Sequence, residues 1–528
     1  MRWRAAPRRA PAQFLLPLPP RRSPPPSSAG WRADAVFDAS LRPFLALTDA
    51  LVAGAPPPAE PELSADEATV AEVLACDVSV AADLAVVPDE SRAVVRMRVL
   101  VLCLGTRGDV EPMLAVAKAL QRRGHAVTLC APDNCARWVR DEHGVAFDAL
   151  GIDFKELLAS RAVREAPSVE RAIGIAVSAA LPRVLAAAAA SAARGVDLVF
   201  ASATFPGGAD LAEAHGAALV TAALGPVWST REHPFFMVPL PRALQCLNRA
   251  TYAIPSMARM MDAALLNRWR RETLGLQRPG PQVLEMGRRT EDGSVAPRMC
   301  AISPSVFAQP ADWDAQTTMA GFWRLDDPSD WKPDAALSAF LGRASSPVVF
   351  IGFGSMTRLE PLALAKIVVP AVRQAGVRAV LGLGWSGSLS EALAGAAQGG
   401  GGGGDDVFLL EAAPHSKLFP LMSAVVHHGG AGTTAAGLSA GCPTLICPVG
   451  ADQPMWGEHV HHRLRCGPAP VALDKLSTAV LAARLRELVG NASFRERAQE
   501  LAARIAREDG LAVAVRVIED EARRRGKM

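Results

Sequence analysis

A short apolar strand that runs into a glycine-rich turn and then an amphipathic helix occurs twice along this chain, and this repeat constrains the fold more than any other feature. The first copy begins with "RVLVLCL" at residues 98–104, continues with "GTRGDVEP" and a predicted helix over Pro112–Arg123, and reaches a second strand, "HAVTLCAP". The second copy begins with "PVVFIGFGSM" near residue 347, followed by a predicted helix over Leu362–Gly376. Strand–helix–strand units of this kind form parallel sheets with right-handed crossovers. The sequence therefore predicts an α/β fold with two doubly wound, Rossmann-like domains.

The domain boundaries follow from changes in composition. We expect one sheet domain over 97–300, a connection over 301–346 that contains "RLDDPSDWKPD", and a second sheet domain over 347–528. Residues 1–33 contain seven arginines, eight prolines and no acidic residue, which fits either an organelle transit segment or an untargeted tail. No role is assigned to 34–96. The expected location is cytoplasmic, or a plastid or mitochondrion if the first segment is a transit peptide.

Composition also bears on several classes of partner. A net charge of +3 over 528 residues gives no indication of nucleic acid as a partner. The nine cysteines are scattered without a C-x-x-C pair, which is typical of reduced thiols in an intracellular protein. The most apolar long stretch, residues 176–193, is interrupted by Pro182 and Arg183, so no membrane span is predicted.

The stretch "VVHHGGAGTTAAGL" holds the strongest candidate for a binding site. Residues 423–428 are a predicted strand, and the helix that follows begins near Thr433. A helix N-terminus at the carboxyl edge of a parallel sheet favours an anion, here of diphosphate type. His428 can donate to a phosphate oxygen, the alternative being a strand-end or core role, whereas His427 points to the other face and is interpreted as structural. The other candidate donor-binding residues of this turn are Gly429, Gly430, Gly432, Thr433 and Thr434.

An Asp–Gln pair follows the next predicted strand, at the same edge of the sheet. Asp452 accepts hydrogen bonds and Gln453 both donates and accepts them, so together they suit the hydroxyl groups of a sugar. The alternative is a helix cap ahead of Pro454.

Five segments resemble, in order, those of the UDP-glycosyltransferases of GT-B type, and the sterol 3β-glucosyltransferase and bacterial glycopeptide branches in particular. They are "GTRGDVEP", "IGFGSM", "LGLGWSG", "HHGGAGTTAAGL" and "GADQPMWGE". The resemblance implies inverting transfer of a hexosyl group, glucose or another hexose, from a UDP-sugar to an acceptor hydroxyl, without a metal or other cofactor. It also implies that Ser355 contacts phosphate, that Asp452 and Gln453 hold the hexose, and that the C-terminal helix crosses back to the first domain.

The same resemblance places a catalytic base in the first domain. Asp109 in "GTRGDVEP" stands where this branch carries its candidate base, and the alternative is a helix cap. Arg107 is left open between pairing with Asp109 and reaching the donor. The plant secondary-metabolite branch has a uracil-stacking Trp and a ribose-binding Glu where this chain has Ala412 and Ala436. Trp385 is therefore the candidate for stacking on the nucleotide base. Whether the donor carries UDP or dTDP stays open.

The segment "GPVWSTREHPFFMVPLP" at 225–241 resembles the acceptor side of sterol glucosyltransferases. Its candidate acceptor-binding residues are Trp228, Phe235, Phe236 and Met237. They predict an apolar wall for a sterol, a polyketide, a polyphenol or another lipid, the alternative being a core patch. An apolar acceptor would also fit peripheral contact with a membrane.

Three further possibilities are weighed against this function. A dinucleotide-dependent oxidoreductase would need G-x-G-x-x-G after the first strand, which "GTRGDV" lacks. A catalytically silent lipid- or nucleotide-binding protein on the same fold stays open. The histidines His459, His461 and His462, with His415 upstream, lack ligand spacing for a metal and are interpreted as a solvated helix face.

Overall fold

The computed structural model describes residues 96–164, 169–238, 240, 242–277, 295–325, 331–343, 346–354, 361–382 and 406–528. Two predicted donor-binding residues, Ser355 and Trp385, and the segments 1–33 and 34–95 lie outside these described residues.

The first copy of the repeat forms a seven-stranded sheet in which every neighbouring pair is parallel. Its strand order is β3-β2-β1-β4-β5-β6-β7. The strands are β1 Arg98–Leu102, β2 Ala126–Ala131, β3 Ala146–Ala149, β4 Leu198–Ser202, β5 Ala218–Ala223, β6 Arg298–Cys300 and β7 Thr317–Met319. The helical segments are α4 Arg107–Arg122, η1 Asp133–Cys135, η2 Trp138–Glu142, α5 Phe154–Ala159, α6 Arg161–Arg164, α7 Val169–Ala192, α8 Gly208–Ala214, η3 Arg242–Leu247, α9 Asn248–Thr251 and α10 Ala253–Glu272.

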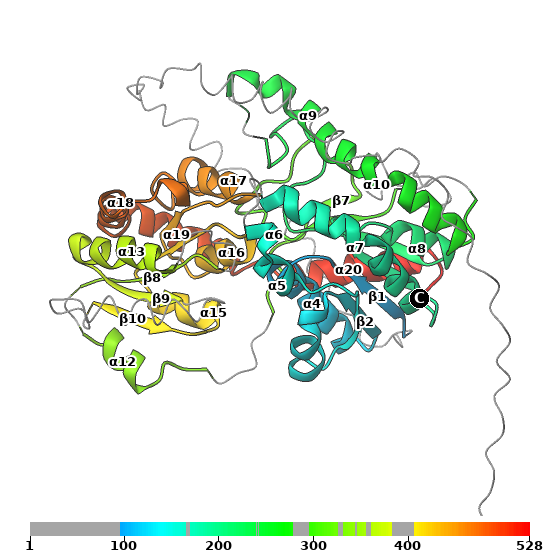
Figure 1. The fold of residues 1–528 in the computed structure, drawn as a ribbon, viewed down its shortest axis with the longest axis horizontal. Helices are drawn as coiled ribbons and strands as arrows, with labels where there is room; N and C mark the ends of the chain where they lie inside the picture. The colour runs from blue at the N-terminus through cyan, green and yellow to red at the C-terminus, as the bar shows by residue number, and fades with distance from the viewer. Residues whose placement is uncertain are drawn as a thin grey trace, which may run out of the picture. The chain divides into compact units, whose positions relative to one another are not determined.

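The second copy forms a five-stranded parallel sheet of order β10-β9-β8-β11-β12. Its strands are β8 Val348–Gly352, β9 Arg378–Gly382, β10 Val407–Leu410, β11 Ala424–His427 and β12 Thr444–Ile446. The helical segments are α12 Ala335–Leu341, α13 Pro361–Ala375, α15 His415–Leu418, η4 Phe419–Leu421, α16 Ala431–Ser439, α17 Gln453–Glu458, η5 His459–Leu464, η6 Leu473–Lys475, α18 Thr478–Gly490, α19 Ala492–Ile505 and α20 Gly510–Arg524. The two parallel sheets confirm the predicted fold class (Figure 1).

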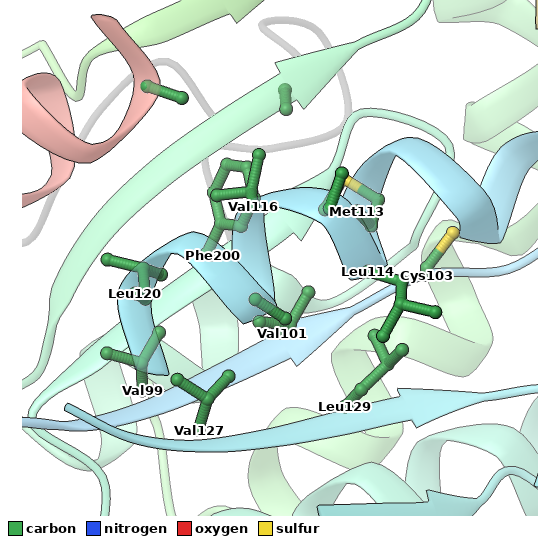
Figure 2. Close-up of a cluster of buried hydrophobic side chains, with 14 of the residues drawn as sticks. Val99, Val101, Cys103, Met113, Leu114, Val116, Leu120, Val127, Leu129 and Phe200 are labelled. Carbon is green, nitrogen blue, oxygen red and sulfur yellow. The ribbon is translucent and has the colours of Figure 1, made fainter. Parts of the chain in front are cut away.

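The core of the first sheet shows why these segments fold as they do. Leu114 and Leu120 of α4 are fully buried and pack over Val99 and Val101 of β1 and Leu129 of β2 (Figure 2). Burying each leucine side chain contributes about 1.5–3 kcal/mol. The apolar positions of α4 recur at helical spacing, so one face of the helix covers the sheet while its N-terminal turn stays at the carboxyl edge of β1.

Helix α4 begins five residues before its predicted start. Thr106 precedes the helix, and the carboxylate of Asp109 accepts hydrogen bonds from the Thr106 backbone N–H (2.7 Å) and hydroxyl (3.0 Å). This capping arrangement starts the helix at Arg107 and leaves Pro112 inside it. The prediction that Pro112 marks the first turn was wrong because the cap, which lies upstream, decides where the helix begins.

The helix expected at the C-terminus is α20, and it packs against α4 and β5 of the first sheet. Ala514, Ile518 and Ala522 of α20 lie in the same buried cluster as the α4 leucines. Glu519 of α20 accepts hydrogen bonds from Arg123, which directly follows α4. The end of the chain is thus joined to the first sheet by both apolar and charged contacts.

Helix α7 corrects the expectation about membrane spans. Its residues 172–192 have a mean hydropathy of 1.8 and are long and apolar enough to cross a membrane, with 33% of the most apolar window buried in the protein. Pro182 lies inside the helix without ending it. One face of α7, with Leu181, Val184 and Leu185, packs in the core beside β1 and β4.

Candidate active site

His428 directly follows β11, and glycines around it leave room for its ring. A Cβ atom on Gly430 would lie 2.7 Å from Nε2 of His428, and one on Gly354, which follows β8, would lie 2.9 Å from its Cε1. Gly429 has a φ of 96°, and a Cβ there would lie 2.6 Å from Cγ2 of Ile446. The glycine-rich sequence therefore allows the chain to turn sharply while the imidazole occupies the space between two glycine residues.

The imidazole of His428 is half-buried and neutral near pH 7. Burial lowers its pKa to about 4. Its Nδ1 atom is buried and has no hydrogen-bond partner among the described residues. A neutral imidazole keeps one N–H, so His428 can donate a hydrogen bond to an anion without carrying a charge.

Helix α16 starts two residues earlier than predicted, with Gly430 as its N-cap residue. Gly432 and Thr433 therefore lie in the first turn, where backbone N–H groups have no partner within the helix. Thr434 is fully buried, and its hydroxyl donates to the carbonyl of Gly430 at 3.0 Å. The backbone N–H groups and Thr433 thus form the donor end of this helix, while the hydroxyl proton of Thr434 is used inside it.

Asp109 is the helix cap that the alternative interpretation described. Both of its hydrogen bonds to Thr106 end on Oδ2. Gly105, with a φ of 152°, lies so close that a Cβ atom there would overlap this carboxyl group. Burial raises the pKa of Asp109 above its ordinary value, and the bonds from Thr106 oppose this effect. A cap can also serve as a base, so the catalytic assignment of Asp109 stays a prediction.

Asp452 is close enough to Asp109 for their charges to interact. Helix α4 approaches α16, and the charge of Asp109 contributes to raising the pKa of Asp452. The larger cause is burial, and the pKa of Asp452 reaches about 6. The carboxylates expected to act as base and as hexose ligand therefore share one region, beside the N-terminus of α16.

The Asp–Gln pair is held by contacts within its own loop and helix. The carboxylate of Asp452 makes no cap hydrogen bond to α17, and its Oδ2 accepts instead from Nε1 of Trp456 at 3.0 Å. Oε1 of Gln453 accepts from the backbone N–H groups of Val449 (2.7 Å) and Gly450 (3.2 Å). Asp452 is thus the N-cap residue of α17 by position, as the alternative expects, but its carboxylate bonds to Trp456 instead of capping the helix. The side chain of Gln453 closes the loop that precedes α17.

Arg107 contacts Trp138 and Glu111 rather than Asp109, and its other expected role, reaching the donor, stays a prediction. Its guanidinium lies 4.4 Å from the ring centre of Trp138, and its Nε lies 3.5 Å from a carboxylate oxygen of Glu111. Arg107 nevertheless lies near enough to His415 to act on its pKa. Burial is the main cause that lowers the pKa of His415 to about 4, and the charges of His428 and Arg107 lower it further. Arg107 is therefore a cation near the His428 region.

The four candidate acceptor residues do not form one exposed wall. Trp228 and Phe235 are 3% and 5% exposed and belong to different buried clusters. Phe236 is half-buried, with its ring centre 4.4 Å from that of Phe235, and Met237 is 48% exposed. The core interpretation therefore fits Trp228 and Phe235, and an acceptor surface in this segment would have to use Phe236 and Met237.

The histidines after α17 are not all on a solvated face. His462 is exposed and pairs with Glu458 at 3.1 Å, as a solvated face predicts. His459 instead stacks on Phe307 with ring centres 4.5 Å apart, and its Nε2–H donates to the carbonyl of Val306 at 2.7 Å. Within the described part of the chain, no group of three or more His, Cys, Asp or Glu side chains could hold a metal ion.

Sequence reasoning missed Trp456 and His415 as residues of this region. Trp456 stands four residues after Asp452, a spacing that brings two side chains together on a helix, so the contact could have been predicted. His415 carries no such signal, because its proximity to His428 depends on how α15 lies beside the sheet.

Two known domains account for most of this arrangement. Residues 99–234 match the glycosyltransferase family 28 N-terminal domain, and residues 402–519 match the erythromycin biosynthesis protein CIII-like C-terminal domain. The first match covers β1, α4 and Asp109, and the second covers His428, α16 and the Asp452 loop. Each of the two sheets thus contains a match to a domain found in glycosyltransferases.

This chain has sterol 3-beta-glucosyltransferases among its curated relatives. It is 33% identical over 436 residues to the sterol 3-beta-glucosyltransferase of Neosartorya fischeri, across 80% of this chain and 29% of that protein. It is 34% identical over 438 residues to sterol 3-beta-glucosyltransferase UGT80A2 of Arabidopsis thaliana, across 80% of this chain and 65% of that protein. The chain thus spans less than two thirds of the length of these relatives.

Solved structures agree on the fold. The calicheamicin glycosyltransferase CalG4 superposes with a TM-score of 0.58 at 20% identity, covering 81% of this chain and 98% of CalG4. The glycosyltransferase VinC, in complex with DTDP, gives a TM-score of 0.58 at 22% identity, covering 81% of this chain and 100% of VinC. At this identity the likeness establishes the GT-B fold alone.

Proposed function

We propose that this protein transfers a hexosyl group, glucose in the first instance, from a UDP-sugar to the 3-hydroxyl of a sterol or to a hydroxyl of a similarly apolar acceptor. The observation that carries the proposal is the meeting of the α16 N-terminus and neutral His428 with two half-buried carboxyl groups, Asp109 and Asp452. The sterol 3-beta-glucosyltransferase relatives support the acceptor class. Because these relatives are longer than this chain, the sterol acceptor is a proposal for this chain.

The proposed reaction is a direct displacement at the anomeric carbon. Asp109 takes the proton of the acceptor hydroxyl, the acceptor oxygen forms a bond to the anomeric carbon, and the bond from that carbon to the diphosphate breaks. Attack from the opposite face converts an α-linked donor into a β-glycoside. A raised pKa suits Asp109 to this task, because a base whose pKa lies nearer to the working pH holds the transferred proton more readily.

The leaving diphosphate would be bound by backbone N–H groups of α16 and by the N–H of His428. Because these donors are fixed before the reaction, they stabilise the developing negative charge without rearranging. Arg107 adds a nearby positive charge. We therefore propose that transfer needs neither a metal nor another cofactor.

The direct test uses the purified full-length protein with UDP-glucose and dTDP-glucose, with and without cholesterol or sitosterol in detergent. Nucleoside diphosphate release that depends on sterol, with a steryl hexoside detected by mass, would support the proposal, and equal rates with EDTA would support metal independence. Release with a polyphenol or polyketide alone would move the acceptor to that class. Tight donor binding without turnover under any of these conditions would identify a silent binder.

A vesicle sedimentation assay addresses location. We propose a cytoplasmic protein, with peripheral membrane contact as the route to an apolar acceptor and an organelle as the alternative if residues 1–33 direct import. Retention by sterol-containing vesicles would support the contact, and recovery entirely in the supernatant would count against it.

A further inference from the structure

Trp456 is fully buried, and its one polar atom has a partner. The indole Nε1–H donates to Oδ2 of Asp452 at 3.0 Å. Among the residues that the structure describes, four other indole nitrogens are also buried yet have no hydrogen-bond partner. They belong to Trp228, Trp269, Trp313 and Trp323. A partner for a buried indole is therefore not automatic in this protein, and the one at Trp456 ends on the carboxylate expected to hold the hexose.

The ring of Trp456 is fixed in place by its surroundings. It lies in a buried cluster with Ile446 of β12 and with Ile302 and Met319 from the end of the first sheet domain. Its edge meets His459, with ring centres 6.4 Å apart and planes at 88°. His459 in turn is held by its stack on Phe307 and its hydrogen bond to Val306. The indole N–H therefore has one direction available to it.

The contact with Trp456 is a side-chain hydrogen bond that orients the carboxylate of Asp452, which also interacts with the backbone of Asp452 itself. Its carboxylate makes no cap hydrogen bond to α17, and the preceding residue, Ala451, has a left-handed φ of 55°. A carboxylate with one oxygen held by an N–H can turn little about its last torsion, so its second oxygen is presented in a defined place.

We infer that Trp456 is a positioning residue of the donor site: its indole N–H holds Oδ2 of Asp452 so that the carboxylate accepts a hydroxyl of the donor hexose in one orientation. The inference rests on the proposed function, because it assigns the hexose to Asp452. Trp456 itself does not touch the substrate.

The hydrogen bond also acts on the protonation of Asp452. It favours the charged carboxylate and so lowers the pKa, against burial and the charge of Asp109, which raise it to about 6. Asp109 is the ionisable group whose charge acts on Asp452 from α4, and His459 on the following segment is neutral, with a pKa of about 4. Loss of the indole N–H should therefore raise the pKa of Asp452 further, and the acidic limb of a pH–rate profile should move to higher pH.

The test is Trp456→Phe, which removes the N–H and keeps an aromatic ring in the cluster. The matched control is Trp323→Phe, where a buried indole without a partner is changed in the same way. Loss of one hydrogen bond to a charged group predicts a KM for UDP-glucose raised about tenfold, an unchanged Kd for UDP, and an acidic limb at higher pH. The control should leave KM and the limb unchanged.

The possible results separate the inference from the proposed function. Unchanged KM and pH profile in folded Trp456→Phe would overturn the positioning role while leaving transfer intact. Wild-type protein that binds UDP no more weakly than UDP-glucose and transfers nothing would overturn the proposed function, and the inference with it.

A second measurement does not need the variant to fold. In wild-type protein labelled with ¹⁵N, one indole N–H resonance should shift with a midpoint near the pKa of Asp452, and should respond to UDP-glucose but not to UDP. Indole resonances that are all insensitive to both pH and hexose would also overturn the inference.

Discussion

Glu519 offers the sharpest test of how the C-terminal helix is held on the first sheet. Its side chain is 4% exposed, and its two oxygens face Arg123 (3.1 and 3.2 Å), Nε2 of His125 (3.2 Å) and Arg523 (3.1 Å). These contacts lower the pKa of Glu519 to about 2, against the effect of burial. The perturbation is Glu519→Gln, which keeps the shape and removes the charge.

The magnitude follows from which partners stay buried after the change. Removing one partner of a fully buried ion pair costs about 3–5 kcal/mol. Here Arg123 and Arg523 have side chains 42% and 49% exposed, so both can return to water, and much of that cost is avoided. His125 is 0% exposed and cannot. We therefore expect Glu519→Gln to lower the free energy of unfolding by about 2 kcal/mol at pH 7.

The sign of the pH dependence is set by a lowered pKa. A carboxylate with a folded-state pKa of about 2 and an ordinary value of 4.5 stabilises the protein fully above the ordinary value. This contribution is lost as pH falls from about 5 towards 2. The difference between wild type and Glu519→Gln should therefore shrink over that range.

The assay is urea unfolding followed by tryptophan fluorescence at several pH values. The matched control is Asp520→Asn, the next residue, whose side chain is 59% exposed and pairs with Arg523 on the surface. That change should cost less than about 0.5 kcal/mol. Equal unfolding midpoints for the two variants, or a difference that does not change with pH, would refute the reasoning.

Four further predictions concern the candidate site and the loop beside it. His428→Ala should weaken donor binding, measured as a raised KM for the nucleotide sugar. Asp109→Asn should lower kcat by about 10²–10⁴ with little change in KM. Full activity of Asp109→Asn would show that Asp109 is not the base. The transfer rate should fall as pH drops through about 6, because Asp452 must be ionised to accept a hydroxyl, and a flat profile down to pH 5 would contradict this. Ala451→Gly should raise the free energy of unfolding by about 0.5–1 kcal/mol, because glycine adopts the left-handed φ of 55° without strain. Thermal or urea unfolding measures this change. A lowered stability would show that the backbone at Ala451 is not strained.

The local pattern of the sequence was enough to predict the sheets and the edge at which the site lies. Strands β1 and β8 lie in apolar runs that lead into Gly105 and Gly352, and parallel strands place their carboxyl ends at one edge. His428, Asp452 and Asp109 could be placed there for the same reason. The local pattern could not decide between two possible roles for the same side chain.

That choice depends on side-chain contacts, of which some are local and others join residues far apart in the chain. Asp109 was weighed as cap or base, and the cap is present, which required the backbone of Thr106 to close on its carboxylate. His459 was assigned to a solvated face, yet Phe307, which lies between β6 and β7 of the first sheet, stacks on it. Trp228 and Phe235 were weighed as acceptor wall or core, and distant aromatic residues bury both.

The charges of the site indicate which groups set the pH dependence of transfer. Burial lowers the pKa values of His415, His427 and His428 below the physiological range, so none of them supplies positive charge at pH 7. A diphosphate bound at α16 would then be balanced by the helix N-terminus and by the guanidinium of Arg107. Because neutral histidine donates without titrating near pH 7, the pH dependence of transfer should come from the carboxylates. Asp452 and Asp109, rather than the histidines that mark the site in the sequence, would thus set the lower limit of the working pH range.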